Sequence, residues 1–464
     1  MEIRTSKKGV LWSYIAQFFT IGTGLLTLPA ILKILNADEV GFNYILISIT
    51  SMIGLFDLGF TSQFSRYLTY IFSGAQSIQK EGIANNYGNS INSHLLSVTI
   101  RTAKRIYKII SFVALLCLLV LGTPYIWKVT EGFTVINNAL AIWIIFSISS
   151  FFNIYYLYLN AFLQGKGLIK EAKQAMVFSK ILQITITFTL LFLNCGLMSV
   201  VIANLISPFL YRLYAYKHFY DAYIKKILNE ENVTESEIKE TFSILFYNAK
   251  KIGVIAIMAS LLGYASTLVI GAFLPLPIVG SYGIMVQLVG IVGNVANTYN
   301  TSKLPQYSNM LVTGQKEGLR REFGLAMCIF YVIYSLGIIC LFIAPIIFKI
   351  FNFSVQLPSL SILAFYSITR LFEQNQSAYC QLLVVENRLV YYRSAIITCL
   401  AEFLLLYVLL YFGYGVIGVV VAQAIPLFLY CAWKWPIYVL KRYNISFYND
   451  IFCASKHIIF KSEK

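Results

Sequence analysis

The chain of 464 residues is 58% hydrophobic, only 12% charged, and carries a formal net charge of +16. Soluble domains contain about 25% charged residues, so this composition excludes an ordinary water-soluble surface and indicates a membrane protein. The basic residues are spread over all the polar segments between apolar runs, as membrane topology alone would place them. We therefore do not expect a nucleic acid as a partner.

About 12 apolar runs reach the roughly 20 residues that a helix needs to cross a bilayer. In the first half these runs are 10–35, 42–72, 106–127, 139–163, 176–193 and 196–216. In the second half they are 253–273, 278–302, 323–348, 357–385, 394–412 and 415–435. The expected fold is an all-α polytopic membrane protein with two six-helix bundles around a central cavity.

Lysine and arginine collect on one side of the predicted spans, for example in 101–108, 166–173 and 316–321. The opposite side carries only Lys33, Lys128 and Lys349. Basic residues are retained on the cytoplasmic side, so both termini are predicted to be cytoplasmic.

A charged segment divides the runs into six plus six, and we interpret it as a cytoplasmic linker helix at 217–249, with partner binding as the alternative. The expected organisation is an N-terminal bundle (1–216), this linker, a C-terminal bundle (250–435) and a cytoplasmic tail (436–464). The two halves resemble each other, as Lys7-Lys8-Gly9 and Lys250-Lys251-Ile252-Gly253 illustrate. Repeats of this kind favour a transporter whose pseudo-twofold axis runs along the membrane normal.

The segments expected outside the membrane are short, which disfavours a membrane polymerase that acts on polysaccharide. The sequence contains no Walker A loop and no HExxH motif, and its scattered cysteines do not have metal-ligand spacing. We expect no enzymatic activity, no metal and no cofactor, with H⁺ or Na⁺ coupling as a hypothesis.

Ionisable residues inside apolar spans cost about 2.5–3.5 kcal/mol on insertion scales and usually face a cavity or one another. The candidates are Asp57, Glu402 and the pair Arg370 and Glu373, which lie on one helix face and can neutralise each other. The pair could be purely structural. However, Gln374, Asn375 and Gln376 extend the polar run (RLFEQNQ), which favours a water-filled cavity.

Arg66 and Lys303 lie at the cytoplasmic ends of the second and eighth predicted spans, near equivalent positions of the two repeats. One interpretation is that both side chains snorkel to lipid headgroups. The other is that they bind a phosphorylated headgroup, since arginine binds phosphate bidentately and lysine supplies a point charge.

The residues 7–35, Val40-Gly41 and 55–67 (LFDLGFTSQFSRY) resemble Wzx-type flippases of O-antigen and other polysaccharide repeat units. These belong to the multidrug/oligosaccharidyl-lipid/polysaccharide exporter superfamily and have a MATE-like fold. The resemblance implies that an undecaprenyl-pyrophosphate-linked oligosaccharide moves to the periplasmic leaflet of a bacterial inner membrane by alternating access. It implies membrane lipids as partners and leaves open a polysaccharide polymerase and a chain-length regulator.

Under this resemblance, Arg66, Lys303, Arg370, Gln374 and Asn375 would line the translocation path. The acidic residues Asp57, Glu373 and Glu402 depart from a purely cationic lumen and suggest exchange of a proton or sodium ion. A multidrug or small-molecule antiporter of the same superfamily is the alternative function.

Overall fold

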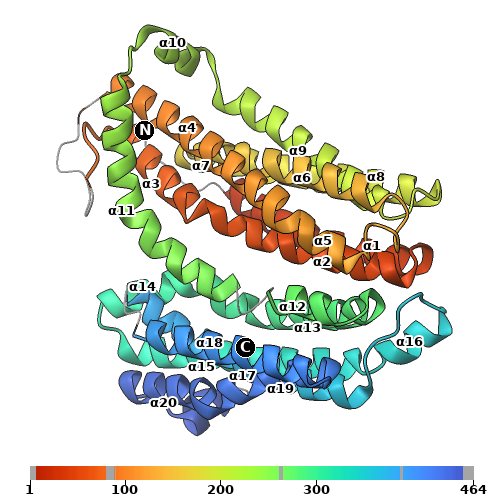
Figure 1. Cartoon of the computed structure of the whole chain (residues 1–464). Coiled ribbons are helices and arrows are strands. Elements are labelled where there is room, and N and C mark those ends of the chain that lie inside the picture. Colours follow the sequence, from red (N-terminus) through yellow and green to blue (C-terminus); the bar gives the residue numbers. More distant parts are fainter. Residues whose placement is uncertain (1–6, 80–87, 89, 261–264, 387–389, 453–464) are drawn as a thin grey trace. The chain divides into compact units, whose positions relative to one another are not determined.

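The computed structural model describes residues 7–79, 88, 90–260, 265–386 and 390–452. The chain is built from helices (Figure 1), and its internal contacts divide it into two compact units. Unit 1 comprises residues 1–260 and unit 2 residues 261–464. Each unit is described by itself.

In unit 1, α8 packs against α1 and α9, α6 contacts α4 and α9, and α3 lies along α7. The elements are α1 (Lys7–Ile34), α2 (Ala37–Ile53), η1 (Gly54–Asp57), α3 (Phe60–Phe72), α4 (Ser93–Cys117), η2 (Leu118–Gly122), α5 (Thr123–Val129), α6 (Ala139–Tyr155), α7 (Tyr158–Gly165), α8 (Ile169–Phe192), α9 (Met198–Phe219), α10 (Ala222–Glu230) and α11 (Glu235–Ser260).

The apolar run 42–72, which we expected to form one span, is broken in the structure. Leu58 and Gly59 have left-handed backbone angles, with φ of 46° and 80°, and they separate η1 from α3. Asp57 stabilises this break because its carboxylate accepts hydrogen bonds from the Thr61 amide (3.2 Å), the Thr61 hydroxyl (2.8 Å) and the Tyr107 hydroxyl (2.6 Å). The polar residue in the apolar run therefore ends one helix and starts the next.

The expected linker helix is in fact two helices, α10 and α11. The break occurs because Thr234 and Glu237 cap α11 reciprocally: the Thr234 amide donates to Glu237 Oε2 at 2.8 Å, and the Glu237 amide donates to Thr234 Oγ1 at 3.4 Å. The backbone amide of Thr234 and then the His94 side chain lower the pKa of Glu237 to about 2.

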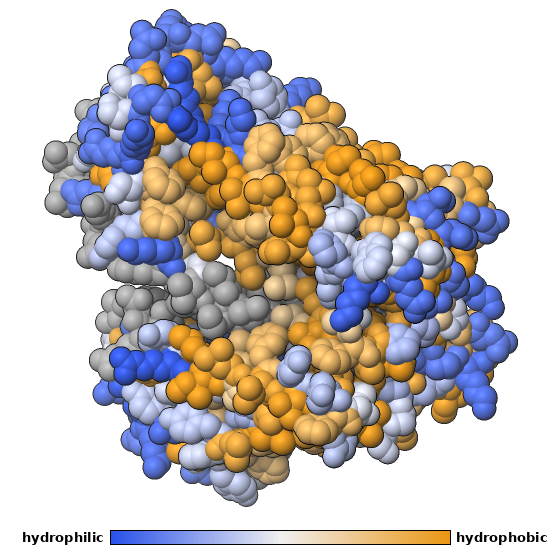
Figure 2. Space-filling view, in the orientation of Figure 1, coloured by the Kyte–Doolittle hydropathy of each residue, from blue (hydrophilic) through white to orange (hydrophobic). Residues whose placement is uncertain are grey.

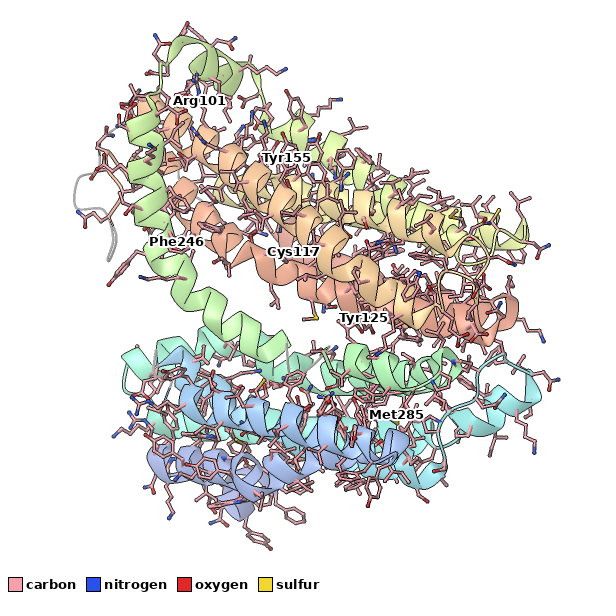
Figure 3. The ribbon with its side chains drawn as sticks, viewed as in Figure 1. Arg101, Cys117, Tyr125, Tyr155, Phe246 and Met285 are labelled. Carbon is pink, nitrogen blue, oxygen red and sulfur yellow. The ribbon has the colours of Figure 1, made fainter. Side chains whose placement is uncertain are left out.

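The N-terminal part of α4 holds α10 and α11 in unit 1. His94 lies 3.1 Å from Glu231 and 2.7 Å from Glu237, and Arg101 donates to the backbone carbonyls of Leu228 and Glu231. Figure 3 shows Arg101 at the end of α4 that lies near α10.

Unit 2 is centred on an aromatic core in which Phe323 packs edge-on against Tyr307 and Tyr379. Its elements are α12 (Ser266–Phe273), α13 (Leu276–Ser302), α14 (Leu304–Val312), α15 (Lys316–Leu341), α16 (Ala344–Ile350), α17 (Leu360–Val385), α18 (Tyr392–Tyr411), α19 (Gly415–Pro426), η4 (Leu427–Cys431), α20 (Ala432–Tyr443) and η5 (Phe447–Phe452).

Within the described residues, 10 helical segments are long and apolar enough to cross a membrane. Two expected spans are not among them. One is α17, whose polar run lowers its hydropathy, and the other is 253–273, of which residues 261–264 lie outside the described residues. Apolar side chains cover much of the visible surface of the long helices, whereas hydrophilic residues gather around α10 (Figure 2). The structure is that of a multi-pass membrane protein.

Candidate functional site

The polar face of α17 is built around an ion pair. The Arg370 guanidinium pairs with the Glu373 carboxylate, and its Nε donates to the Tyr366 hydroxyl at 2.7 Å. The Arg370 side chain is 15% exposed, while that of Glu373 is 37% exposed. The pairing expected from the spacing of three residues is therefore confirmed, and its acidic member is the more accessible one.

Glu402 of α18 belongs to a second set of polar groups in unit 2. It is 6% exposed, and its Oε1 accepts a hydrogen bond from the Ser266 hydroxyl of α12 at 3.3 Å. The Gln423 amide of α19 donates to the same Ser266 oxygen (3.3 Å) and to the Tyr282 hydroxyl of α13 (3.1 Å). Gln423 Oε1 has no hydrogen-bond partner in the described part of the chain.

The two sets of polar groups meet at an aromatic contact. The rings of Tyr282 and Tyr366 pack edge-to-face with centroids 6.1 Å apart. Glu402 is also close enough to Glu373 and Arg370 for their charges to interact. One polar network thus connects α12, α13, α17, α18 and α19 inside the apolar unit 2, and we call it the unit 2 network.

The remaining polar residues of α17 contact neighbouring helices. The Tyr331 hydroxyl of α15 donates to Asn375 Oδ1 at 2.6 Å, which gives Asn375 a structural partner. Gln374 packs at Gly293 of α13, where a Cβ would lie 3.4 Å from Gln374 Cγ. Two amide residues of α17 were predicted to line the translocation path. Of these, Asn375 is hydrogen-bonded to α15, and Gln374 packs against α13 at Gly293.

Lys303 lies at the junction of α13 and α14 and is paired with an acid. Its Nζ is 3.2 Å from Glu322 of α15 and 3.0 Å from Gln306 Oε1. Glu322 was not identified from the sequence because no local pattern relates it to Lys303. Lys303 therefore offers a partly neutralised charge rather than an unpaired cation.

Arg66 and Asp57 belong to unit 1, so they are separate from the unit 2 network. Arg66 is exposed on α3, and its Nη2 donates to Gln63 Oε1 at 2.5 Å. The structure shows no acidic partner for Arg66 among the described residues. Of the predicted cations, Arg66 is the one whose charge is most available to a ligand.

The sequence interpretation did not consider Lys180 and Arg212, which are charged residues within predicted spans of the first half. Lys180 lies in α8 and Arg212 in α9, and Arg212 is buried. The rule that selected Arg370 applies equally to them, because each is a cation within an apolar run. Ser266 and Tyr366 were also missed, but their side chains are unremarkable in a membrane helix and only the fold brings them together.

The fold is similar to that of solved transporter structures, two of which are described as members of the MOP superfamily. Two solved structures resemble the chain over nearly its full length. One is a multidrug resistance MATE family transporter in an inward-facing conformation (TM-score 0.65, 13% identity, covering 94% of this chain and 98% of that one). The other is the lipid II flippase MurJ in an inward closed conformation (TM-score 0.67, 16% identity, 98% and 93% covered).

A third similar structure is a MOP superfamily transporter from Pyrococcus furiosus, with a TM-score of 0.50, 13% identity, and 96% and 98% of the two chains covered. Its description reports a binding pocket of reverse polarity. No protein-family model matches the sequence, and no curated protein matches it either. The expected MATE-like fold is confirmed, while identities of 13–16% establish the fold alone.

Proposed function

We propose that the protein is a flippase for an undecaprenyl-pyrophosphate-linked oligosaccharide, such as an O-antigen or related polysaccharide repeat unit. It would move this substrate from the cytoplasmic to the periplasmic leaflet of a bacterial inner membrane by alternating access. Both termini would be cytoplasmic. A polysaccharide polymerase and a chain-length regulator would act on the delivered unit outside.

The unit 2 network is the observation that carries this proposal. A lipid-linked sugar needs polar partners inside the membrane, where charged side chains cost about 2.5–3.5 kcal/mol each on insertion scales and usually mark a substrate or ion pathway. The fold shared with a lipid II flippase supports the same class of substrate. Arg66, Lys303, Arg370, Gln374 and Asn375 would contact the diphosphate and the sugars.

A second candidate is an ion-coupled multidrug or small-molecule antiporter, and the buried carboxylate of Glu402 favours it. A buried carboxylate can bind a proton or sodium ion in one state of the cycle and a cationic substrate in another. The fold is also similar to that of a multidrug transporter. In the flippase proposal, Asp57, Glu373 or Glu402 would instead couple an ion gradient to lipid movement.

The proposal is tested with the purified protein in vesicles that carry a fluorescent undecaprenyl-pyrophosphate-linked oligosaccharide in one leaflet. We expect protein-dependent loss of the label from that leaflet and a lower rate for Arg370→Gln. Lys225→Gln, an exposed cation of α10, is the matched control and should transport as the wild type does.

Transport of free cationic drugs without any movement of the lipid-linked sugar would reject the flippase in favour of the antiporter. In cells, deletion of the gene should remove surface polysaccharide and cause lipid-linked units to accumulate. Normal surface polysaccharide after deletion would contradict the proposal.

A further inference from the structure

Arg212 of α9 is a buried charge whose hydrogen-bonding capacity is only partly used. The residue is 6% exposed, and its Nη2 donates to Asn153 Oδ1 of α6 at 2.7 Å. Its Nη1 is buried and has no hydrogen-bond partner among the residues that the structure describes. A guanidinium has five N–H donors and cannot lose its charge in a protein, so this side chain retains donors that need an acceptor.

Aromatic rings surround the Arg212 guanidinium in place of an acid. Its Cζ lies 4.3 Å from the ring centroid of Phe209, 5.0 Å from that of Tyr156 and 5.9 Å from that of Phe152. Cation–π contacts contribute about 0.5–2 kcal/mol each, but they act on the face of the group and leave its in-plane N–H donors unused. No acidic side chain of the described residues forms an ion pair with Arg212.

A chain of polar contacts leads from Arg212 to the second cation, Lys180. Asn153 Nδ2 lies 3.5 Å from Ser149 Oγ, which donates to the Asn204 carbonyl of α9 at 3.0 Å. Asn204 Oδ1 accepts from Gln183 of α8 (2.6 Å), and Gln183 Oε1 accepts from Lys180 Nζ (2.9 Å). Lys180, like Arg212, has no ion-pair partner among the described residues.

Two unpaired cations among three apolar helices are costly unless an anion completes them. Removing one member of a buried charge pair typically costs about 3–5 kcal/mol, which is the penalty of leaving the other charge uncompensated. A bound oxyanion would accept a hydrogen bond from the unused Nη1 and would also neutralise the charge of the guanidinium. The site is accessible because Asn153, the direct partner of Arg212, is exposed.

We propose that Arg212, with Lys180 as a second cation, forms an oxyanion-binding site in unit 1. The oxyanion is either the carboxylate of an acidic sugar or the diphosphate of a polyprenyl carrier. These two sources are chosen on the basis of the proposed function. It predicts that the transported molecule carries negative charge that α6, α8 and α9 recognise.

The test measures binding to the purified full-length protein with three probes. They are farnesyl diphosphate, a tetrasaccharide that contains glucuronic acid, and the neutral maltotetraose. We expect at least one anionic probe to bind the wild type and to bind Arg212→Gln at least about tenfold more weakly, as loss of a charge-assisted hydrogen bond implies. Lys180→Gln should weaken the same probe by a smaller factor.

Lys217→Gln, an exposed cation at the cytoplasmic end of the same helix, is the matched control and should bind as the wild type does. Arg212→Lys provides a second test if Arg212→Gln does not fold. It keeps the charge but loses the planar fork, so it should bind more weakly than the wild type and discriminate against maltotetraose. Preference for farnesyl diphosphate would identify the carrier as the source of the oxyanion, and preference for the acidic tetrasaccharide would identify the sugar.

Equal affinity of the wild type and Arg212→Gln for both anionic probes would overturn the inference, as would absence of binding to the wild type. If lipid-linked sugar moves equally well in both proteins, the flippase proposal survives without this site. If Arg212-dependent anion binding occurs but no lipid-linked sugar moves, the site survives and the flippase proposal fails.

Discussion

At the scale of single residues, the charges of α17 compensate each other. Arg370 and Glu373 form an ion pair on one helix face, and the Tyr366 hydroxyl accepts a hydrogen bond from Arg370 Nε. Because membrane helices expose few groups that could replace a lost partner, each residue depends on the other for its stability.

We predict that Arg370→Gln or Glu373→Gln alone lowers the free energy of unfolding by about 1–3 kcal/mol. This loss is smaller than the one expected for a fully buried ion pair, because the Glu373 side chain is 37% exposed. The double variant should lose less than the sum of the two. Thermal unfolding in detergent measures this cycle, and strictly additive losses would show that the pair is not coupled.

Glu402 and Asp57 differ in how well their carboxylates are satisfied. Asp57 accepts hydrogen bonds of 2.6–3.2 Å from Thr61 and Tyr107, whereas Glu402 accepts a longer one of 3.3 Å from Ser266, with the Gln423 amide as a further donor nearby. A carboxylate with unused acceptors inside a membrane is the better candidate for binding and releasing an ion.

We therefore expect Glu402→Gln to abolish ion-dependent transport and Asp57→Asn to reduce it, with membrane insertion intact in both. The readout is the transport rate in vesicles with and without an imposed proton or sodium gradient. Unchanged gradient dependence in both variants would refute a coupling role for these acids.

At the scale of elements, the break between η1 and α3 contains two left-handed residues, Leu58 and Gly59, and Gly59 has the larger positive φ. Gly59 adopts a φ of 80°, a left-handed conformation in which a residue with a side chain is strained. Gly54 has a right-handed helical conformation, and a Cβ added to it would meet no other atom within 4 Å.

We predict that Gly59→Ala destabilises the protein by about 1–2 kcal/mol, the usual cost of a left-handed residue with a Cβ. Gly54→Ala is the matched control and should be neutral or stabilising by about 0.4–1 kcal/mol. Thermal unfolding of the two variants decides the matter, and similar transition temperatures would contradict the argument.

The same elements show how far the sequence alone could lead. Hydropathy located the long helices, and the spacing of Arg370 and Glu373 predicted their ion pair. Hydropathy could not locate the break at Leu58 and Gly59, because Asp57 is held there by Tyr107, which is 50 residues away in the chain and is brought near only by the fold. The contacts of Lys303 with Glu322 and of Glu402 with Ser266 join distant parts of the chain, so only the folded structure reveals them.

At the scale of the whole molecule, the flippase proposal requires water to reach the polar face of α17. Gln374 lies on that face, while Ile368 is an exposed apolar residue of the same helix, 51% exposed, that lipid would cover.

In a chain whose native cysteines are replaced, we predict that a membrane-impermeant thiol reagent modifies Gln374→Cys in at least one conformation of the transport cycle. Ile368→Cys should stay unmodified because lipid excludes the charged reagent. Mass spectrometry of the labelled protein gives the extent of reaction. Protection of residue 374 under all conditions would mean that α17 does not face a water-filled path.

The carboxylate of Asp57 has a consequence for how a phosphate could be held. The N-terminal end of a helix carries a partial positive charge and often binds anions, yet at α3 the chain's own Asp57 already occupies that position. An incoming phosphate would have to displace a covalently attached competitor there. Near this end of α3, recognition of a diphosphate would then depend on cationic side chains such as Arg66, and its affinity should fall with rising ionic strength.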